Sequence, residues 1–144
     1  MIPLQLARDL KTAGLVWKAG LHDFFAIPER DLDERVFVIT DVMAYLDLFQ
    51  GWPVVTFHGT AEWGLDYILS SEVVWIPTEA QLRQELVDLL RRQGDPLLQL
   101  ALQADDYCCE IGYNQQRVTF TAKTAEEAYG QALLHVLQLE NLPK

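Results

Sequence analysis

His58, Glu62 and Asp66 are the residues whose types and spacing best suit chemistry. An imidazole and two carboxylates four residues apart would share one face of an α-helix, where they could bind a divalent metal or transfer protons. The trio therefore raises the alternative of a small metal-dependent hydrolase. Gly59 and Thr60 oppose it, because they favour a helix that begins only after His58. We favour surface and capping roles, and assign no catalytic residue and no metal.

Two of the four tryptophans form a second group of candidates, because they lie near the ends of expected elements. Trp52 follows Gly51 at the start of a strand, and Trp63 falls in the first turn of a helix. We expect most tryptophans in the core and these two to be the most exposed. Exposed tryptophans often dominate binding at protein interfaces. The candidate binding residues are therefore Trp52, His58, Glu62, Trp63 and Asp66.

The remaining reactive side chains fit structural roles. The acidic loop at residues 29–34 lacks the glycine and the distal glutamate of a calcium-binding loop. Cys108 and Cys109 are adjacent in an expected strand, so one should face the core and the other solvent, and they are too close for an ordinary disulfide. His135 lies at the margin of an apolar helix face, where we expect packing. We therefore expect no cofactor.

The composition predicts an acidic globular protein. The chain has 144 residues, half of them apolar, and a formal net charge of −10. A chain of this length can bury a core. The negative charge disfavours nucleic acid and anionic membranes, and no apolar run is long enough to span a bilayer. Because the start of the sequence has no signal-peptide pattern, we expect a cytoplasmic protein. We expect its partner to be another protein, and the oligomeric state stays open.

In the N-terminal half, apolar spacing predicts a short helix over residues 3–13 that ends at Gly14. Residues 41–50 fit a short helix about as well as a strand, and we favour the helix. The other expected elements are a hairpin of strands 23–27 and 35–40, a strand at 52–57, a helix at 60–69 and a strand at 73–76.

In the C-terminal half, Thr78 and Gln81 form a predicted capping box, as do Thr124 and Glu127 at the start of the last helix. We expect a packed irregular or helical turn at residues 95–106, followed by a hairpin of strands 107–113 and 117–122. The expected fold is α+β, with one domain over residues 1–144. A single mixed or mainly antiparallel sheet of about six strands should carry four or five helices mainly on one face.

Residues 6–14, 74–78 and 124–128 contain a helix ending in Ala-Gly, an aromatic strand entering a Pro-Thr cap, and a Thr-x-Glu-Glu-Ala helix start. Together they resemble a family of small uncharacterised bacterial and phage proteins. Some bacterial members carry a pilus-assembly label, but this sequence has no phosphate-binding G-x-x-x-x-G-K-[ST] loop, so we do not adopt it. Residues 107–138 also resemble the closing hairpin and helix of HicB-type antitoxins.

The resemblance implies architecture and a bacterial or phage origin more than chemistry. Together with the acidity and the missing catalytic motifs, it favours a non-enzymatic protein-interaction or accessory module of an antitoxin-like or immunity-like kind. The metal-dependent hydrolase centred on His58, Glu62 and Asp66 is the alternative.

Overall fold

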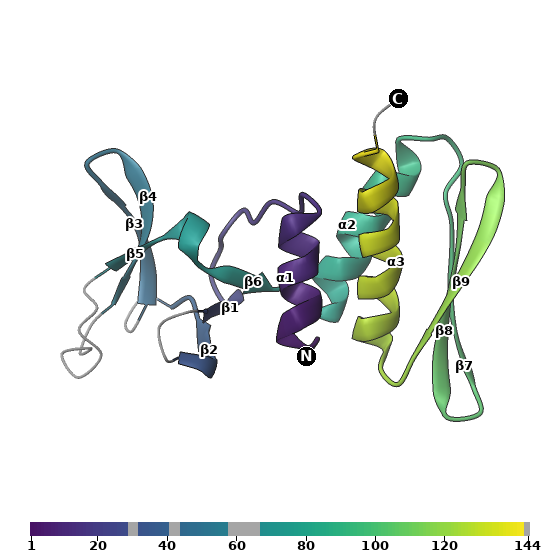
Figure 1. Ribbon diagram of the computed structural model, residues 1–144, viewed down its shortest axis with the longest axis horizontal. Helices are drawn as coiled ribbons and strands as arrows, with labels where there is room; N and C mark the ends of the chain where they lie inside the picture. Colours follow the sequence, from purple (N-terminus) through teal and green to yellow (C-terminus); the bar gives the residue numbers. More distant parts are fainter. Residues whose placement is uncertain (29–31, 41–43, 58–66, 143–144) are drawn as a thin grey trace. The chain divides into compact units, whose positions relative to one another are not determined.

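The computed structural model describes residues 1–28, 32–40, 44–57 and 67–142. These residues contain three α-helices and three antiparallel sheets of three strands each (Figure 1). The chain divides into two compact units. We call Met1–Leu15 with Pro77–Lys144 the helical unit, and Val16–Ile76 the β unit. Whether the two fold as one domain stays a prediction.

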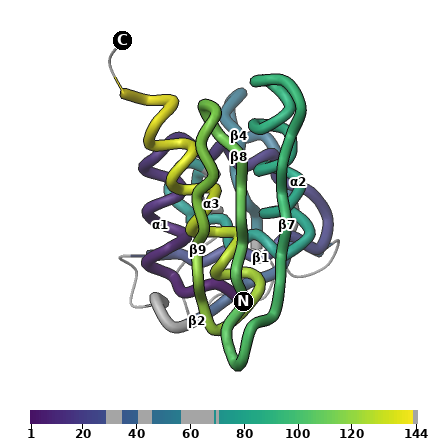
Figure 2. Tube along the Cα trace, turned by 90° about the vertical axis from the view of Figure 1, so that its right-hand side faces the viewer, coloured from purple at the N-terminus to yellow at the C-terminus, as the bar shows by residue number. Residues whose placement is uncertain are grey.

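The helical unit places three helices on one side of a β-meander with strand order β7-β8-β9. Figure 2 shows this sheet in front of the helices. No helix or strand among the described residues of this unit covers the opposite face of the sheet. The elements are α1 (Leu4–Thr12), α2 (Glu79–Arg91), β7 (Leu97–Gln103), β8 (Asp106–Tyr113), β9 (Gln116–Ala122) and α3 (Ala125–Glu140).

Helix α3 lies at the centre of the helical unit, where it contacts α1, α2, β8 and β9. Small side chains allow this close packing: a Cβ at Gly130 would lie 2.8 Å from Leu6 Cδ2 of α1. The N–H of Glu127 donates to Thr124 Oγ1 at 3.2 Å, which confirms Thr124 as the cap. The fully buried side chains of α3 are Ala128, Ala132, Leu133 and Val136.

The β unit contains two sheets, with strand orders β2-β1-β6 and β3-β4-β5. Its core is built around Phe25, whose ring centroid lies 5.8 Å from that of Trp17 and 5.5 Å from that of Phe37. Ile27, Ile39, Val55 and Val73 complete this core. The elements are β1 (Phe24–Ile27), β2 (Leu32–Val38), β3 (Ala44–Phe49), β4 (Trp52–Phe57), β5 (Tyr67–Leu69), the 3-10 turn η2 (Ser70–Glu72) and β6 (Val74–Ile76).

Asp23 is a buried carboxylate that fixes the segment leading into β1. It accepts hydrogen bonds from Trp17 Nε1 and from the N–H of Gly20, both at 2.9 Å. Its backbone carbonyl also accepts a hydrogen bond of 3.0 Å from the N–H of Ile39, the residue that follows β2. Because a buried charge must be satisfied by hydrogen bonds, Asp23 has a structural role here.

Several predictions are confirmed. The first helix, the two expected hairpins and the last helix form as predicted. The capping box of α2 is also present, since Thr78 Oγ1 accepts from the Gln81 N–H and Gln81 Oε1 accepts from the Thr78 N–H.

Other predictions are wrong. The described residues form three small sheets and three α-helices, where we expected one six-stranded sheet and four or five helices. Residues 44–49 form β3 instead of a helix, because a two-residue turn pairs them with β4. Residues 97–103 form β7 instead of an irregular turn, because they pair along β8. Of the helix expected at 60–69, residues 60–66 lie outside the described part, and Tyr67–Leu69 form β5.

Candidate functional site

The structure describes one of the five candidate binding residues. Trp52 is the first residue of β4, and 67% of its surface is exposed. His58, Glu62, Trp63 and Asp66 lie outside the described residues, so the hydrolase alternative stays a prediction. Within the described part of the chain, no three His, Cys, Asp or Glu side chains are placed to hold a metal ion.

Trp52 belongs to the tip of the hairpin formed by β3 and β4. It lies directly opposite Phe49, and the next pair down the hairpin is Leu48 with Pro53. The turn residues Gln50 and Gly51 have φ values of +52° and +84°, as in the two-residue turns that close tight hairpins. Successive residues of a strand face opposite sides, so both sides of the tip carry apolar side chains.

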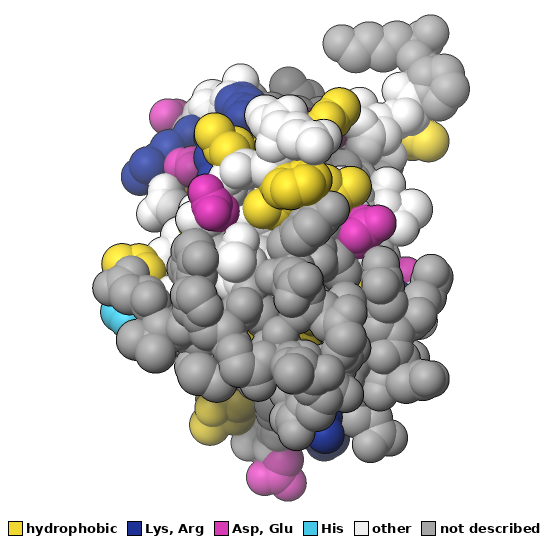
Figure 3. All heavy atoms as spheres, turned by 90° about the vertical axis from the view of Figure 1, so that its left-hand side faces the viewer, with side chains coloured by type: hydrophobic (Ala, Val, Ile, Leu, Met, Phe, Trp, Pro, Cys, Tyr) yellow, Lys and Arg dark blue, Asp and Glu magenta, His cyan; other side chains and the backbone are white. Residues whose placement is uncertain are grey.

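These apolar side chains are open to solvent. Leu48 is 67% exposed and Phe49 is 43% exposed. In the view of Figure 3, hydrophobic side chains gather toward the top, with carboxylates on both sides of them. Single exposed apolar residues are ordinary, whereas a group of them marks an interaction surface. We call Leu46, Leu48, Phe49, Trp52 and Pro53 the hairpin tip.

The hairpin tip offers contact surface and little reactive chemistry. Asp47 is the sole charged residue in the sequence from Ala44 to Phe57. Its Oδ1 accepts a hydrogen bond of 2.7 Å from the N–H of Leu48. Asp47 is therefore bonded to the backbone of the next residue, within an otherwise apolar surface.

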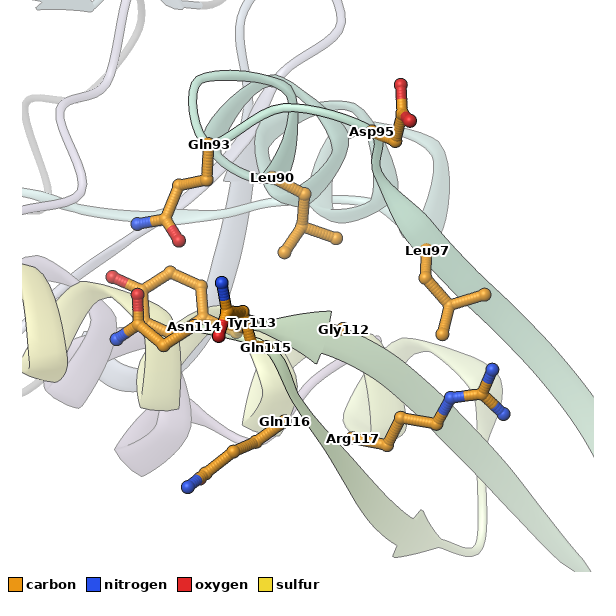
Figure 4. A pocket seen from close by; sticks show the side chains of 10 residues that line it. All are labelled: Leu90, Gln93, Asp95, Leu97, Gly112, Tyr113, Asn114, Gln115, Gln116 and Arg117. Carbon is orange, nitrogen blue, oxygen red and sulfur yellow. The ribbon is translucent and has the colours of Figure 1, made fainter.

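A groove in the helical unit is the second candidate site (Figure 4). Its volume is about 640 Å³. It lies where α2 ends, β7 begins and the β8–β9 turn closes. Leu90 and Leu97 provide apolar surface, and Asn114 and Gln115 form the turn with φ values of +52° and +62°. The other lining residues are Gln93, Asp95, Gly112, Tyr113, Gln116 and Arg117.

The lining of this groove suits hydrogen bonding better than proton transfer. Its charged groups are Asp95 and Arg117, and Figure 4 shows the Asp95 carboxylate directed away from the Arg117 guanidinium. The set of lining residues, all within the described part of the chain, contains no histidine, cysteine or serine. The lining therefore does not include the Ser-His or Cys-His pair that commonly activates a nucleophile.

The two cysteines behave as the alternation of a strand predicts. Cys109 is buried, and burial raises the pKa of its thiol to about 11. Cys108 lies on the other face, with its Sγ 3.7 Å from both Gln103 Oε1 and Thr121 Oγ1. His135 packs on Phe120, with 5.2 Å between the ring centroids, so its expected packing role is confirmed.

No protein-family model, curated protein or solved structure matches the chain. Family membership, function and origin therefore stay predictions. Within the described residues, every helix is too short or too polar to cross a bilayer.

The sequence interpretation missed most of the hairpin tip. It selected Trp52, but it placed Leu48 and Phe49 in a helix, where they would have been partly covered. The usable signal was the Gln50-Gly51 pair, since a residue tolerant of positive φ followed by glycine is typical of a two-residue hairpin turn.

Proposed function

We propose that the protein is a non-enzymatic interaction module of the antitoxin, immunity or accessory type, and that it binds another protein through the hairpin tip. The observation that carries the proposal is the group of exposed apolar side chains around Phe49 and Trp52. A folded chain gains nothing for its own stability by leaving these groups in water.

The geometry of the tip favours insertion into an apolar groove of the partner. Apolar side chains on both sides of a two-residue turn form a narrow wedge, with Leu48 on one side and the Phe49–Trp52 pair on the other. Large aromatic side chains fill pockets of this kind and contribute much of the binding energy. The net charge of −10 favours a partner that is basic around its groove.

Affinity capture with matched variants tests the proposal. The bait is the full chain, and the test variant replaces both Phe49 and Trp52 with alanine. The control is Leu142→Ala, which removes a side chain that is 58% exposed outside the hairpin tip. We expect a protein that the wild type and the control retain and the double variant loses. Retention of the same proteins by all three baits, or of none by the wild type, would refute the role of the tip.

A further inference from the structure

Strand β7 is an edge strand without the protection of the other edges. Among the described residues, the six edge strands are β2, β3, β5, β6, β7 and β9. Open edges pair readily with other chains, and proteins guard them with charged residues or by keeping them short. The strands β5 and β6 have three residues each. The sequences of β2, β3 and β9 include charged residues, whereas the seven residues of β7, LLQLALQ, include none.

The outer edge of β7 is open in the helical unit. The strand pairs with β8, and no other strand among the described residues pairs with it. Figure 2 shows it at one edge of the sheet. Leu102 lies opposite Tyr107 on the side of the sheet that faces the helices, yet it is 61% exposed. The edge therefore combines free backbone groups with a leucine that the unit does not cover.

The charge pattern along this edge permits a second copy of the chain as its partner. Two copies of a chain with a net charge of −10 repel each other over most of their surfaces. Residues 96–104 form an uncharged stretch between Asp95 and Asp105. A second copy can approach along this stretch without bringing like charges together.

We propose that two copies of this chain pair through β7, antiparallel, around a two-fold axis at Gln99. The result is a continuous sheet of six strands with the helices of both copies on the same side. In this register Leu98 lies opposite the partner's Leu100, and Asp95 lies opposite the partner's Gln103. Centring the axis on Leu100 would instead place Asp95 opposite the partner's Asp105, and like charges in direct opposition destabilise a strand pair.

The expected dimer is reversible. A single strand pair buries less surface than the roughly 1,600 Å² of a typical stable complex, so association should depend on concentration. Sedimentation equilibrium of the full chain up to roughly 100 μM covers the range in which such contacts form. A wild type that stays monomeric throughout this range overturns the proposal.

Two matched variants locate the contact. Gln99 and Thr119 are both exposed, lie on the same face of the sheet and are direct cross-strand neighbours of Glu110. Gln99→Glu and Thr119→Glu therefore place the same charge beside the same carboxylate within one copy. In the proposed dimer the Gln99→Glu change also brings two carboxylates together at the axis. The Gln99→Glu change should therefore raise the dissociation constant of the dimer about fivefold more than Thr119→Glu does. Equal effects, or a larger effect of Thr119→Glu, refute the pairing through β7.

A charge exchange tests the register. Gln99→Lys alone should weaken dimerisation, because two ammonium groups then meet at the axis. An equimolar mixture of Gln99→Lys and Gln99→Glu should restore it, because each mixed dimer has opposite charges there. If the mixture dimerises no more tightly than each variant does alone, the two-fold axis lies elsewhere and the proposed register is wrong.

Cross-linking provides an independent measurement. The Cα atoms of directly paired residues in antiparallel strands lie about 4.5–5.5 Å apart, within disulfide range. In a Cys108→Ser background, Gln99→Cys should form a covalent dimer under mild oxidation, and Thr119→Cys should not. The reverse result assigns the contact to β9. Loss of the dimer on replacing both Phe49 and Trp52 with alanine would assign it to the hairpin tip, and either result overturns the proposal.

Discussion

The helical unit and the β unit differ in how far their apolar side chains are buried. In the helical unit α3 buries a continuous apolar face against two helices and two strands, and threonine caps begin α2 and α3. In the β unit a small core surrounds Phe25, while several apolar side chains of the β3–β4 hairpin remain in solvent. The helical unit thus buries the apolar face of its longest helix, whereas the β unit leaves a group of apolar side chains exposed at one hairpin.

The chain provides a separate optical probe for each unit. All three α-helices of the described residues belong to the helical unit, so helical circular dichroism reports on that unit. All four tryptophans, Trp17, Trp52, Trp63 and Trp75, belong to the β unit, so tryptophan fluorescence reports on the other. Coincident unfolding by both probes would support a single domain, and separate transitions would show two.

The largest expected effect is that of Phe25→Ala in the β unit. The side chain is fully buried between Trp17 and Phe37, and removing a buried phenylalanine ring costs about 3–5 kcal/mol of unfolding free energy. Urea denaturation followed by tryptophan fluorescence should show the loss. A midpoint close to that of the wild type would mean that this core contributes little to the unit.

Leu133→Ala is the matching change in the helical unit. Leu133 is fully buried in α3, and its truncation should cost about 2–5 kcal/mol. Urea denaturation followed by circular dichroism measures the effect. The control Leu142→Ala should change the free energy of unfolding by less than about 0.5 kcal/mol, because its side chain is already exposed. Equal losses in both variants would contradict the burial of the α3 face.

The two units also differ in how much of them the sequence could predict. In the helical unit the caps at Thr78 and Thr124 and the apolar spacing of α2 and α3 specify the helices locally. Leu86 of α2 and Leu133 of α3 are fully buried there. The approach of α1 to Gly130 was missed, because close contacts between distant helices leave no periodic signal in either one.

Strand partners are harder to predict than strands. Alternation indicates which side of a strand is buried, but it does not specify which edges pair, so one sheet was expected where the described part of the chain forms three. Residues 97–103 have leucines at both odd and even positions, so they lack the alternation from which β7 could have been predicted. For the candidate site, the sequence identified Trp52 as exposed, whereas the turn at Gln50-Gly51, which places Phe49 opposite Trp52, was not recognised.

A smaller effect is expected from Thr124→Ala at the start of α3. The Thr124 hydroxyl satisfies the N–H of Glu127, one of the donors that a helix N-terminus leaves without a partner inside the helix. Its loss should cost about 0.5–2 kcal/mol, and Thr124→Ser should restore most of it. Circular dichroism during urea denaturation measures both variants. Equal destabilisation by serine and alanine would show that the methyl group, and not the hydroxyl, matters.

The smallest expected effect is a pH dependence from Cys109 in the helical unit. Burial raises the pKa of this thiol from 9.0 to about 11, so the folded state holds the proton more tightly than the unfolded state. The stability that this preference provides is complete below pH 9 and is lost as the pH rises toward about 11. At pH 9 the loss of unfolding free energy amounts to about 0.4 kcal/mol, and it grows as the pH rises further.

Burial also raises the pKa of Tyr129, which adds a loss of the same sign at higher pH. The difference between the wild type and Cys109→Ala, measured by urea denaturation from pH 7 to 10, reports the thiol together with the part of the raised Tyr129 pKa that comes from Cys109. The difference should be constant up to about pH 8 and should narrow above pH 9. A difference that stays constant to pH 10 would show that the thiol has the same pKa in the folded and unfolded states, and that burial in the helical unit is less complete than the comparison requires.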